Sequence, residues 1–256
     1  MATSNPILKN FRSADRPDRR AEEGDHMTLT GTITKTISLL VLLGCIASLT
    51  STGLAAWIPG HRGRGPYLLV TRTFAACFFG AIAIVLLTLW KKWWSPLMAP
   101  IFAIVEGIAL GIASAAIDVR YPGVALQAVS LTVLMCVCLL VAYGAGWIAF
   151  TTTFGKKLSV AIAGVVAYCV GSLLLMLAGA RGLPILAAGI RGGLVSLVII
   201  TAAGMVLIAT CDAAVQRTSE GKPKYFEWYA ALGILVSLVW IYYEMLEALS
   251  KARRTT

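Results

Sequence analysis

Among the carboxylates within or beside long apolar stretches, five are the side chains of this sequence most able to do chemistry: Glu106, Asp212, Glu227, Glu244 and Glu247. On insertion scales, a charged residue at the centre of a membrane helix costs about 2.5–3.5 kcal/mol, so such residues usually face protein or water. A carboxylate in that position can hold a proton or bind a cation. Each of the five is therefore a candidate for proton or cation handling.

Other residue types argue against an enzyme. The two histidines, His26 and His61, both lie outside the apolar stretches, so no intramembrane histidine could activate a serine or contribute to a metal site. Asp212 follows Cys211, whereas an intramembrane aspartyl protease is expected to carry a glycine before its aspartate. The sequence therefore predicts no catalytic residues and no resident cofactor.

Two of the carboxylates have a simple alternative interpretation as charges at helix ends. Glu227 is close in sequence to Lys224 and Trp228, a setting typical of the membrane interface. Glu247 lies four residues before Lys251, which is the spacing of an ion pair on one face of a helix. Both remain candidates beside this interpretation.

The other three carboxylates also have structural interpretations. Glu106 lies well inside an apolar stretch and could be a neutral buried acid, hydrogen-bonded to a neighbouring helix. Asp212 could mark the cytoplasmic end of a helix, and Glu244 could extend toward the far interface. Residue type and position alone do not decide between a functional and a structural role for Glu106, Asp212 and Glu244.

The elements that must position these acids are membrane-spanning helices. The chain is 58% hydrophobic and only 13% charged, against about 25% charged in an average soluble domain. Apolar runs of about 20 residues, enough to cross about 30 Å of hydrocarbon, recur along it. The predicted spans are Ile33–Ile58, Tyr67–Trp90, Leu97–Ile117, Val124–Phe150, Leu158–Ala178, Ile190–Cys211 and Tyr225–Leu249. The sequence predicts an all-α integral membrane protein, a bundle of seven transmembrane helices.

The polar segments set the domain organisation and the expected partners. Residues 1–32 are predicted to form a mobile cytoplasmic tail, residues 33–250 the transmembrane domain, and residues 251–256 a short basic tail. The net charge of +10 comes mostly from Lys and Arg in short connections. Their distribution favours a cytoplasmic N-terminus. We therefore expect the lipid bilayer as partner and no nucleic acid.

Small and aromatic residues indicate how the helices pack and where they meet the interface. Gly107 and Gly111, followed by Ala115, form a small-residue stripe that lets another helix of the same bundle approach closely. Trp90, Trp93 and Trp94 are typical of interfacial anchors. Six cysteines lie in or at the end of apolar runs, where thiols behave as small hydrophobic groups, so no disulfide framework is expected.

Several segments together resemble the Bax inhibitor-1/YccA-like family, the bacterial branch of the transmembrane Bax inhibitor motif superfamily. They are Asp212, Pro223–Tyr229 (PKYFEWY), Leu238–Glu244 (LVWIYYE), Ala99–Gly107, Tyr121–Gly123, Leu126–Ala128 and Ser4–Pro6. The resemblance covers nearly the whole chain. It implies a bacterial inner or plasma membrane protein in which six helices surround a central seventh.

The resemblance also implies an activity. In relatives, two acids on the last two helices share a proton and gate a calcium leak with pH, and Asp212 and Glu244 match these two positions. Two adjacent carboxylates cannot both ionise cheaply, so they titrate as a coupled unit. Once ionised, they offer oxygen ligands to Ca²⁺. A pH-sensitive calcium or cation leak is therefore the leading hypothesis, with Asp212 and Glu244 as gate and possible metal ligands.

Helix geometry questions whether this pair meets. Asp212 and Glu244 are 32 residues apart. A hairpin turning near Gly221 and Lys222 would put them about 15 Å and about 33 Å from the turn at 1.5 Å per residue. Either the sixth helix continues beyond that turn, or Glu227 is the nearer partner of Asp212.

Two further roles follow from the resemblance. In some relatives, a glutamate on the second helix pairs with a nearby basic residue and acts as a latch. The second span of this chain has no acid. Lys91 and Lys92 are the candidate basic residues, and Glu106 is the candidate substitute for the missing glutamate. Relatives resembling YccA are degraded by, and modulate, a membrane-bound AAA protease. The alternative function is therefore a regulatory protein with a membrane protease partner, whose handle is the N-terminal tail.

Overall fold

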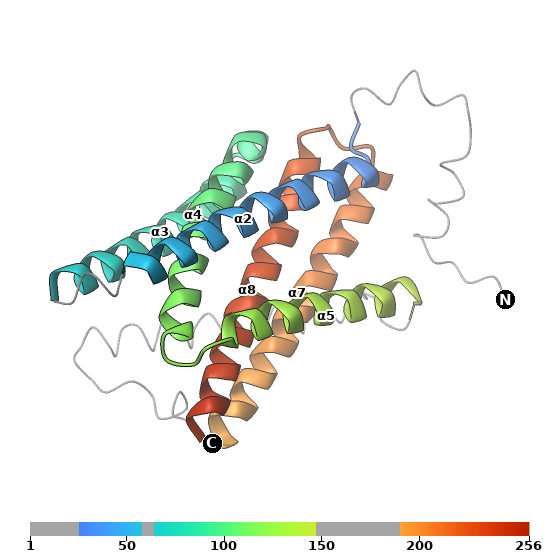
Figure 1. Ribbon diagram of the computed structural model, residues 1–256. Coiled ribbons are helices and arrows are strands. Elements are labelled where there is room, and N and C mark those ends of the chain that lie inside the picture. Colours follow the sequence, from blue (N-terminus) through green and yellow to red (C-terminus); the bar gives the residue numbers. More distant parts are fainter. Residues whose placement is uncertain (1–25, 58–63, 147–189, 256) are drawn as a thin grey trace. The chain divides into compact units, whose positions relative to one another are not determined.

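The computed structural model describes residues 26–57, 64–146 and 190–255. Its elements in chain order are α2 (Leu29–Trp57), α3 (Arg64–Trp90), the short 3₁₀ helix η3 (Lys92–Trp94), α4 (Ser95–Asp118), α5 (Val124–Gly144), α7 (Ile190–Ser219) and α8 (Phe226–Thr255) (Figure 1). Six of these helices are long and apolar enough to cross a membrane. The prediction of an all-α, multi-pass membrane protein is confirmed. The predicted bundle has one more helix, the span Leu158–Ala178, which is fifth in chain order. This span lies outside the described residues.

The helix boundaries follow local sequence signals. α4 begins at Ser95 with Pro96 in its first turn, where the missing backbone N–H of proline would have had no helical partner. Gly123, with a φ of 83°, precedes α5, and Gly221, with a φ of 64°, follows α7. Positive φ favours glycine because it has no Cβ. The turn predicted near Gly221 is confirmed, although α7 continues past the predicted end at Cys211.

The chain forms two compact units. Unit 1 comprises Met1–Arg120 and Thr210–Val236, and unit 2 comprises Tyr121–Ala209 and Ser237–Thr256. α7 and α8 are each divided between the units: Thr210–Ser219 of α7 and Phe226–Val236 of α8 belong to unit 1, and the rest of each helix belongs to unit 2.

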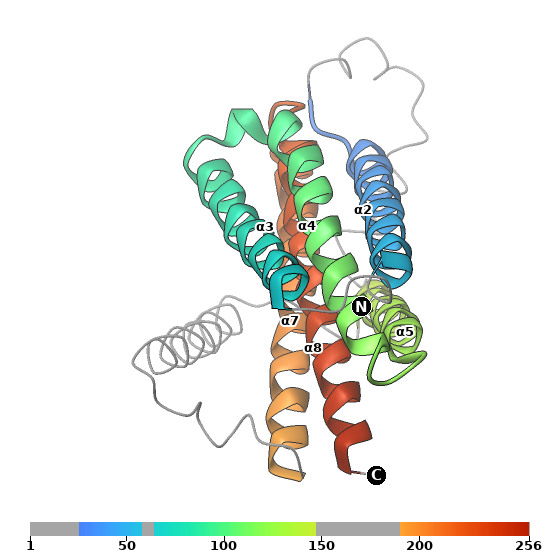
Figure 2. The same cartoon turned by 60° about the vertical axis from the view of Figure 1, so that its left-hand side comes forward.

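In unit 1, α4 lies between α2 and α3 and packs against both (Figure 2). The contact with α2 depends on glycine. A Cβ atom on Gly107 would lie 2.9 Å from the Ile46 Cβ, and one on Gly111 would lie 2.6 Å from the backbone oxygen of Ala47. The predicted packing of the small-residue stripe within one chain is confirmed.

In unit 2, α5 packs against the amino half of α7 at another glycine. A Cβ atom on Gly204 would lie 2.6 Å from the Met135 Cε and 2.9 Å from the Leu139 Cδ1. Elsewhere α5 leaves large apolar side chains exposed, among them Leu126 at 72% and Val141 at 61%. Because apolar surface of this kind is stable in hydrocarbon, these faces are suited to contact lipid.

Candidate functional site

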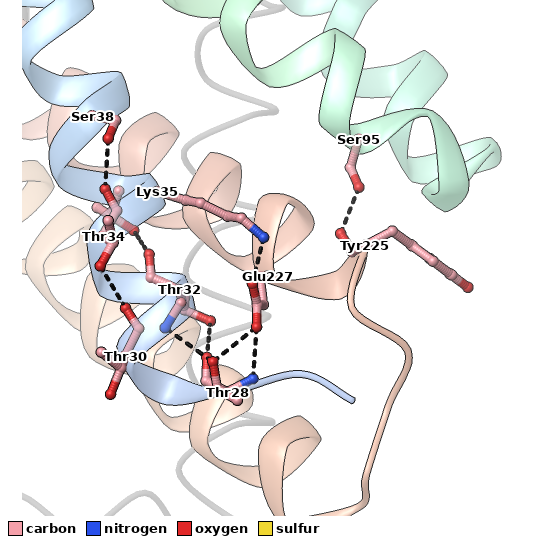
Figure 3. A network of polar contacts seen from close by, with 11 residues as sticks. Thr28, Thr30, Thr32, Thr34, Lys35, Ser38, Ser95, Tyr225 and Glu227 are labelled. Carbon is pink, nitrogen blue, oxygen red and sulfur yellow. Dashed lines mark hydrogen bonds and ion pairs between the residues drawn. The ribbon is translucent and has the colours of Figure 1, made fainter. Parts of the chain in front are cut away.

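Glu227 joins α8 to the start of α2 within unit 1. It is the second residue of α8 and is 1% exposed. Its Oε1 accepts hydrogen bonds from the Thr28 backbone N–H at 2.8 Å and from the Thr28 hydroxyl at 2.9 Å. Its Oε2 forms an ion pair with Lys35 of α2. Figure 3 shows these side chains converging on the carboxylate.

Thr28 is the residue that caps α2. Its hydroxyl accepts the Gly31 N–H at 3.0 Å, and its carbonyl accepts the Thr32 N–H at 3.1 Å. In a capping box, the third helical residue is Glu or Gln, and its side chain accepts the N–H of the capping residue. Here that third residue is Gly31, and Glu227 of α8 accepts the Thr28 N–H instead. The capping box is completed by a different helix.

Gly31 makes room for that arrangement. A Cβ atom on Gly31 would lie 2.5 Å from the Glu227 Oε2 and 2.6 Å from both its Cδ and its Oε1. The carboxylate also lies at the amino end of two helices, α2 and α8, whose dipoles favour a negative charge there. Thr28, Gly31, Lys35 and Glu227 are referred to below as the Glu227 cluster.

Lys35 supplies the opposite charge. Its side chain is 19% exposed, against 2% for that of Glu227. Its ammonium group also lies 5.1 Å from the centroid of the Trp228 ring, a cation–π contact. Removing one partner from a buried pair costs about 3–5 kcal/mol, because it leaves an uncompensated charge. Glu227 thus forms a buried ion pair with Lys35 of α2.

The turn between α7 and α8 forms further hydrogen bonds with other segments of unit 1. The Met27 N–H donates to the Lys222 carbonyl at 2.7 Å, and the His26 Nδ1 lies 2.9 Å from the Gly221 carbonyl oxygen. At the start of α4, the Ser95 hydroxyl donates to the Tyr225 carbonyl at 2.9 Å. The chain leading into α2 is therefore fixed directly to the turn that connects α7 to α8.

Asp212 lies in the carboxyl half of α7, in unit 1. It is half-buried, and its Oδ2 accepts a hydrogen bond from the Gln216 amide at 2.6 Å. Close by, α7 and α8 approach tightly, since a Cβ atom on Gly233 would lie 2.8 Å from the Thr210 Cγ2. This contact places Asp212 two residues beyond a close crossing of the two helices.

Glu244 lies in unit 2, on the half of α8 that also carries a polar pair. The predicted ion pair between Glu247 and Lys251 is confirmed at 2.8 Å. Lys251 is only 7% exposed, and it also donates to the Ser196 hydroxyl of α7 at 3.1 Å. Glu244 and Glu247, three residues apart, share one face of α8. Since Asp212 belongs to unit 1, the proton-sharing pair of Asp212 and Glu244 stays a prediction.

The structure separates Glu106 from the two lysines suggested as its latch partners. Glu106 is 3% exposed and lies about 17 Å along α4 from Ser95 at 1.5 Å per residue. Lys91 and Lys92 precede that helix, and their ammonium groups lie over the rings of Trp94 at 4.7 Å and Tyr229 at 5.9 Å. An ion pair of unit 1 forms between Lys35 and Glu227.

Sequence reasoning missed Thr28, Gly31 and Lys35 as members of a site. The available signal was local: a capping threonine followed, three residues later, by glycine where a capping box carries Glu or Gln.

Across the described ranges, no three His, Cys, Asp or Glu side chains gather as metal ligands would. The Glu227 cluster is thus an electrostatic joint between helices.

The family model described as Bax inhibitor 1 like matches residues 5–254. No curated protein and no solved structure matches the chain significantly.

Proposed function

The chain belongs to the Bax inhibitor 1 like family, and from that membership we propose that it is a pH-sensitive leak channel for Ca²⁺ or another cation. Asp212 and Glu244 act as the gate. The observation that carries the proposal is the match over residues 5–254, which includes both acids and the helices that bear them. The protein acts in a bacterial inner or plasma membrane, with its N-terminus in the cytoplasm.

The chemistry of the gate follows from two carboxylates that share one proton. While the pair holds one proton, the two acids do not repel each other. When the proton leaves, two like charges face each other in a poorly solvated place. They then separate or recruit a cation, and carboxylate oxygens are the ligands that Ca²⁺ prefers. Flux should therefore rise as pH increases through the titration of the pair.

The Glu227 cluster supports this proposal by providing a fixed end for the moving helices. Asp212 precedes the turn at Gly221, and Glu244 follows it on α8. That turn is attached to α2 through Glu227 and through the Met27–Lys222 hydrogen bond. The turn end of the two helices is therefore a fixed point of unit 1.

Calcium flux into liposomes tests the proposal. Reconstituted full chain is expected to pass Ca²⁺ into dye-loaded vesicles, with a pH dependence that is altered in Asp212→Asn and in Glu244→Gln. Glu220→Gln is the matched control, because it also neutralises one acid but lies exposed beside Lys222 at the turn. Flux that is the same in all four proteins at every pH would overturn the gate assignment.

A regulatory protein is the second candidate, favoured by the attachment of residues 26–28 to the α7–α8 turn. In this reading a membrane-bound AAA protease engages the N-terminal segment, and force on that segment reaches the turn directly. Deleting Met1 to Asp25 should then change the turnover of the protease's other substrates, while liposomes show no flux. Unchanged turnover would reject this candidate.

A further inference from the structure

Tyr229 brings together two cations from separate parts of unit 1. The Lys92 ammonium group, from the connection between α3 and α4, lies 5.9 Å from the centroid of its ring. The Arg217 guanidinium carbon, from the end of α7, lies 5.1 Å from the same centroid. The two positive groups are therefore within about 11 Å of each other. Lys91 stands next to Lys92, with its ammonium group 4.7 Å from the Trp94 ring.

The acids at the same turn are already engaged by other cations. Glu227 is paired with Lys35, and Glu220 is 3.2 Å from Lys222. In the described part of the chain, no carboxylate lies within 4.0 Å of the charged nitrogens of Lys91, Lys92 or Arg217. Their positive charges repel one another, and an external anion placed among them would relieve that repulsion.

The position of these cations along the helices indicates the source of the anion. They lie where α3 ends, α4 begins and α7 ends, which is the edge of the apolar spans. Trp90 and Trp93 flank them, 82% and 63% exposed. Tryptophan and lysine at such an edge sit at the depth of phospholipid headgroups. The phosphate of an anionic phospholipid headgroup lies at that depth.

We propose that Lys91, Lys92 and Arg217, arranged around Trp94 and Tyr229, form a binding site for the phosphate of an anionic phospholipid. Arginine can donate two parallel hydrogen bonds to a phosphate, and the lysines add charge. The two rings hold the cations in place at the ends of their flexible side chains. The site is independent of ion flux and of the gate.

Native mass spectrometry of the full chain tests this site. Detergent-purified protein is equilibrated with equal amounts of phosphatidylglycerol and phosphatidylcholine of distinct masses, and bound lipid is counted. Because each basic residue near a membrane contributes about 1 kcal/mol toward anionic lipid, Lys92→Gln and Arg217→Gln should each lower the preference for phosphatidylglycerol about fivefold. Binding of phosphatidylcholine should stay unchanged in both variants, which shows that they are folded.

Two further arms make the result decisive. Arg120→Gln removes one exposed positive charge of unit 1 at the other end of α4 and should keep the preference of the wild-type chain. Excess inorganic phosphate should displace little phosphatidylglycerol, since it lacks the acyl chains. A wild-type chain with no preference for phosphatidylglycerol, or an equal loss in Arg120→Gln, would overturn the proposal. Full displacement by inorganic phosphate would assign the site to free anions instead.

Discussion

A Cβ atom on Gly31 would lie 2.5 Å from the Glu227 Oε2. This relationship joins the third residue of α2 to the second residue of α8 and explains why the capping box of α2 is completed from α8. The absent side chain of Gly31 leaves the space that the Glu227 carboxylate occupies. A residue near the start of the described chain and one near its end are thereby part of the same electrostatic joint.

Gly31→Ala should destabilise the protein. The new methyl group meets the buried Glu227 carboxylate, which is held by Thr28 and Lys35. The carboxylate cannot rotate away without losing those contacts. Overpacking of this kind costs about 1–3 kcal/mol. Thermal unfolding in detergent should show the loss. Gly44→Ala is the control on the same helix, because a Cβ there meets nothing within 4 Å; equal losses in both variants would contradict the role of Gly31.

Lys35→Met should be among the most damaging single changes in unit 1. It leaves the Glu227 charge buried without its cation, at a cost of about 3–5 kcal/mol. Glu227→Gln in the same chain should restore part of that loss, because the neutral amide oxygen can still accept the Thr28 N–H. A double-mutant cycle from denaturant unfolding measures the coupling. Strict additivity of the two changes would rule out a functional ion pair.

Gly111→Ala should separate α2 from α4. The nearest atom to a new Cβ is the backbone oxygen of Ala47 at 2.6 Å, and backbone cannot move aside as a flexible side chain can. The expected cost is again about 1–3 kcal/mol. Gly53→Ala serves as control, since it adds the same methyl group to α2 in open space. Retention of the full wild-type unfolding temperature in Gly111→Ala would refute this packing.

Much of the fold could be predicted from the sequence. Membrane spans depend on hydropathy, which is a sum over about 20 neighbouring residues and needs no partner. The turn at Gly221, the stripe at Gly107 and Gly111, and the pair of Glu247 with Lys251 also depend on short spacings, and the structure confirms all of them.

The Glu227 cluster could not be predicted in the same way. Glu227 and Lys35 are separated by 192 positions, and no periodic pattern selects one partner over that distance. The neighbours of Glu227 in sequence, Lys224 and Trp228, suggested a charge at the membrane interface. Its burial at 1% depends on the packing of α2 against the start of α8, which a pattern within one helix does not contain.

In the proposed function, Asp212 and Glu244 titrate as one unit that controls cation flux. The most direct measurement is a pH series of Ca²⁺ flux in liposomes for the wild-type chain, Asp212→Asn, Glu244→Gln and the double variant. Two acids that share a proton should lose their pH response together, so the double variant should resemble either single variant. If the two single changes instead alter the pH response independently and additively, or leave it unchanged, the shared gate is contradicted.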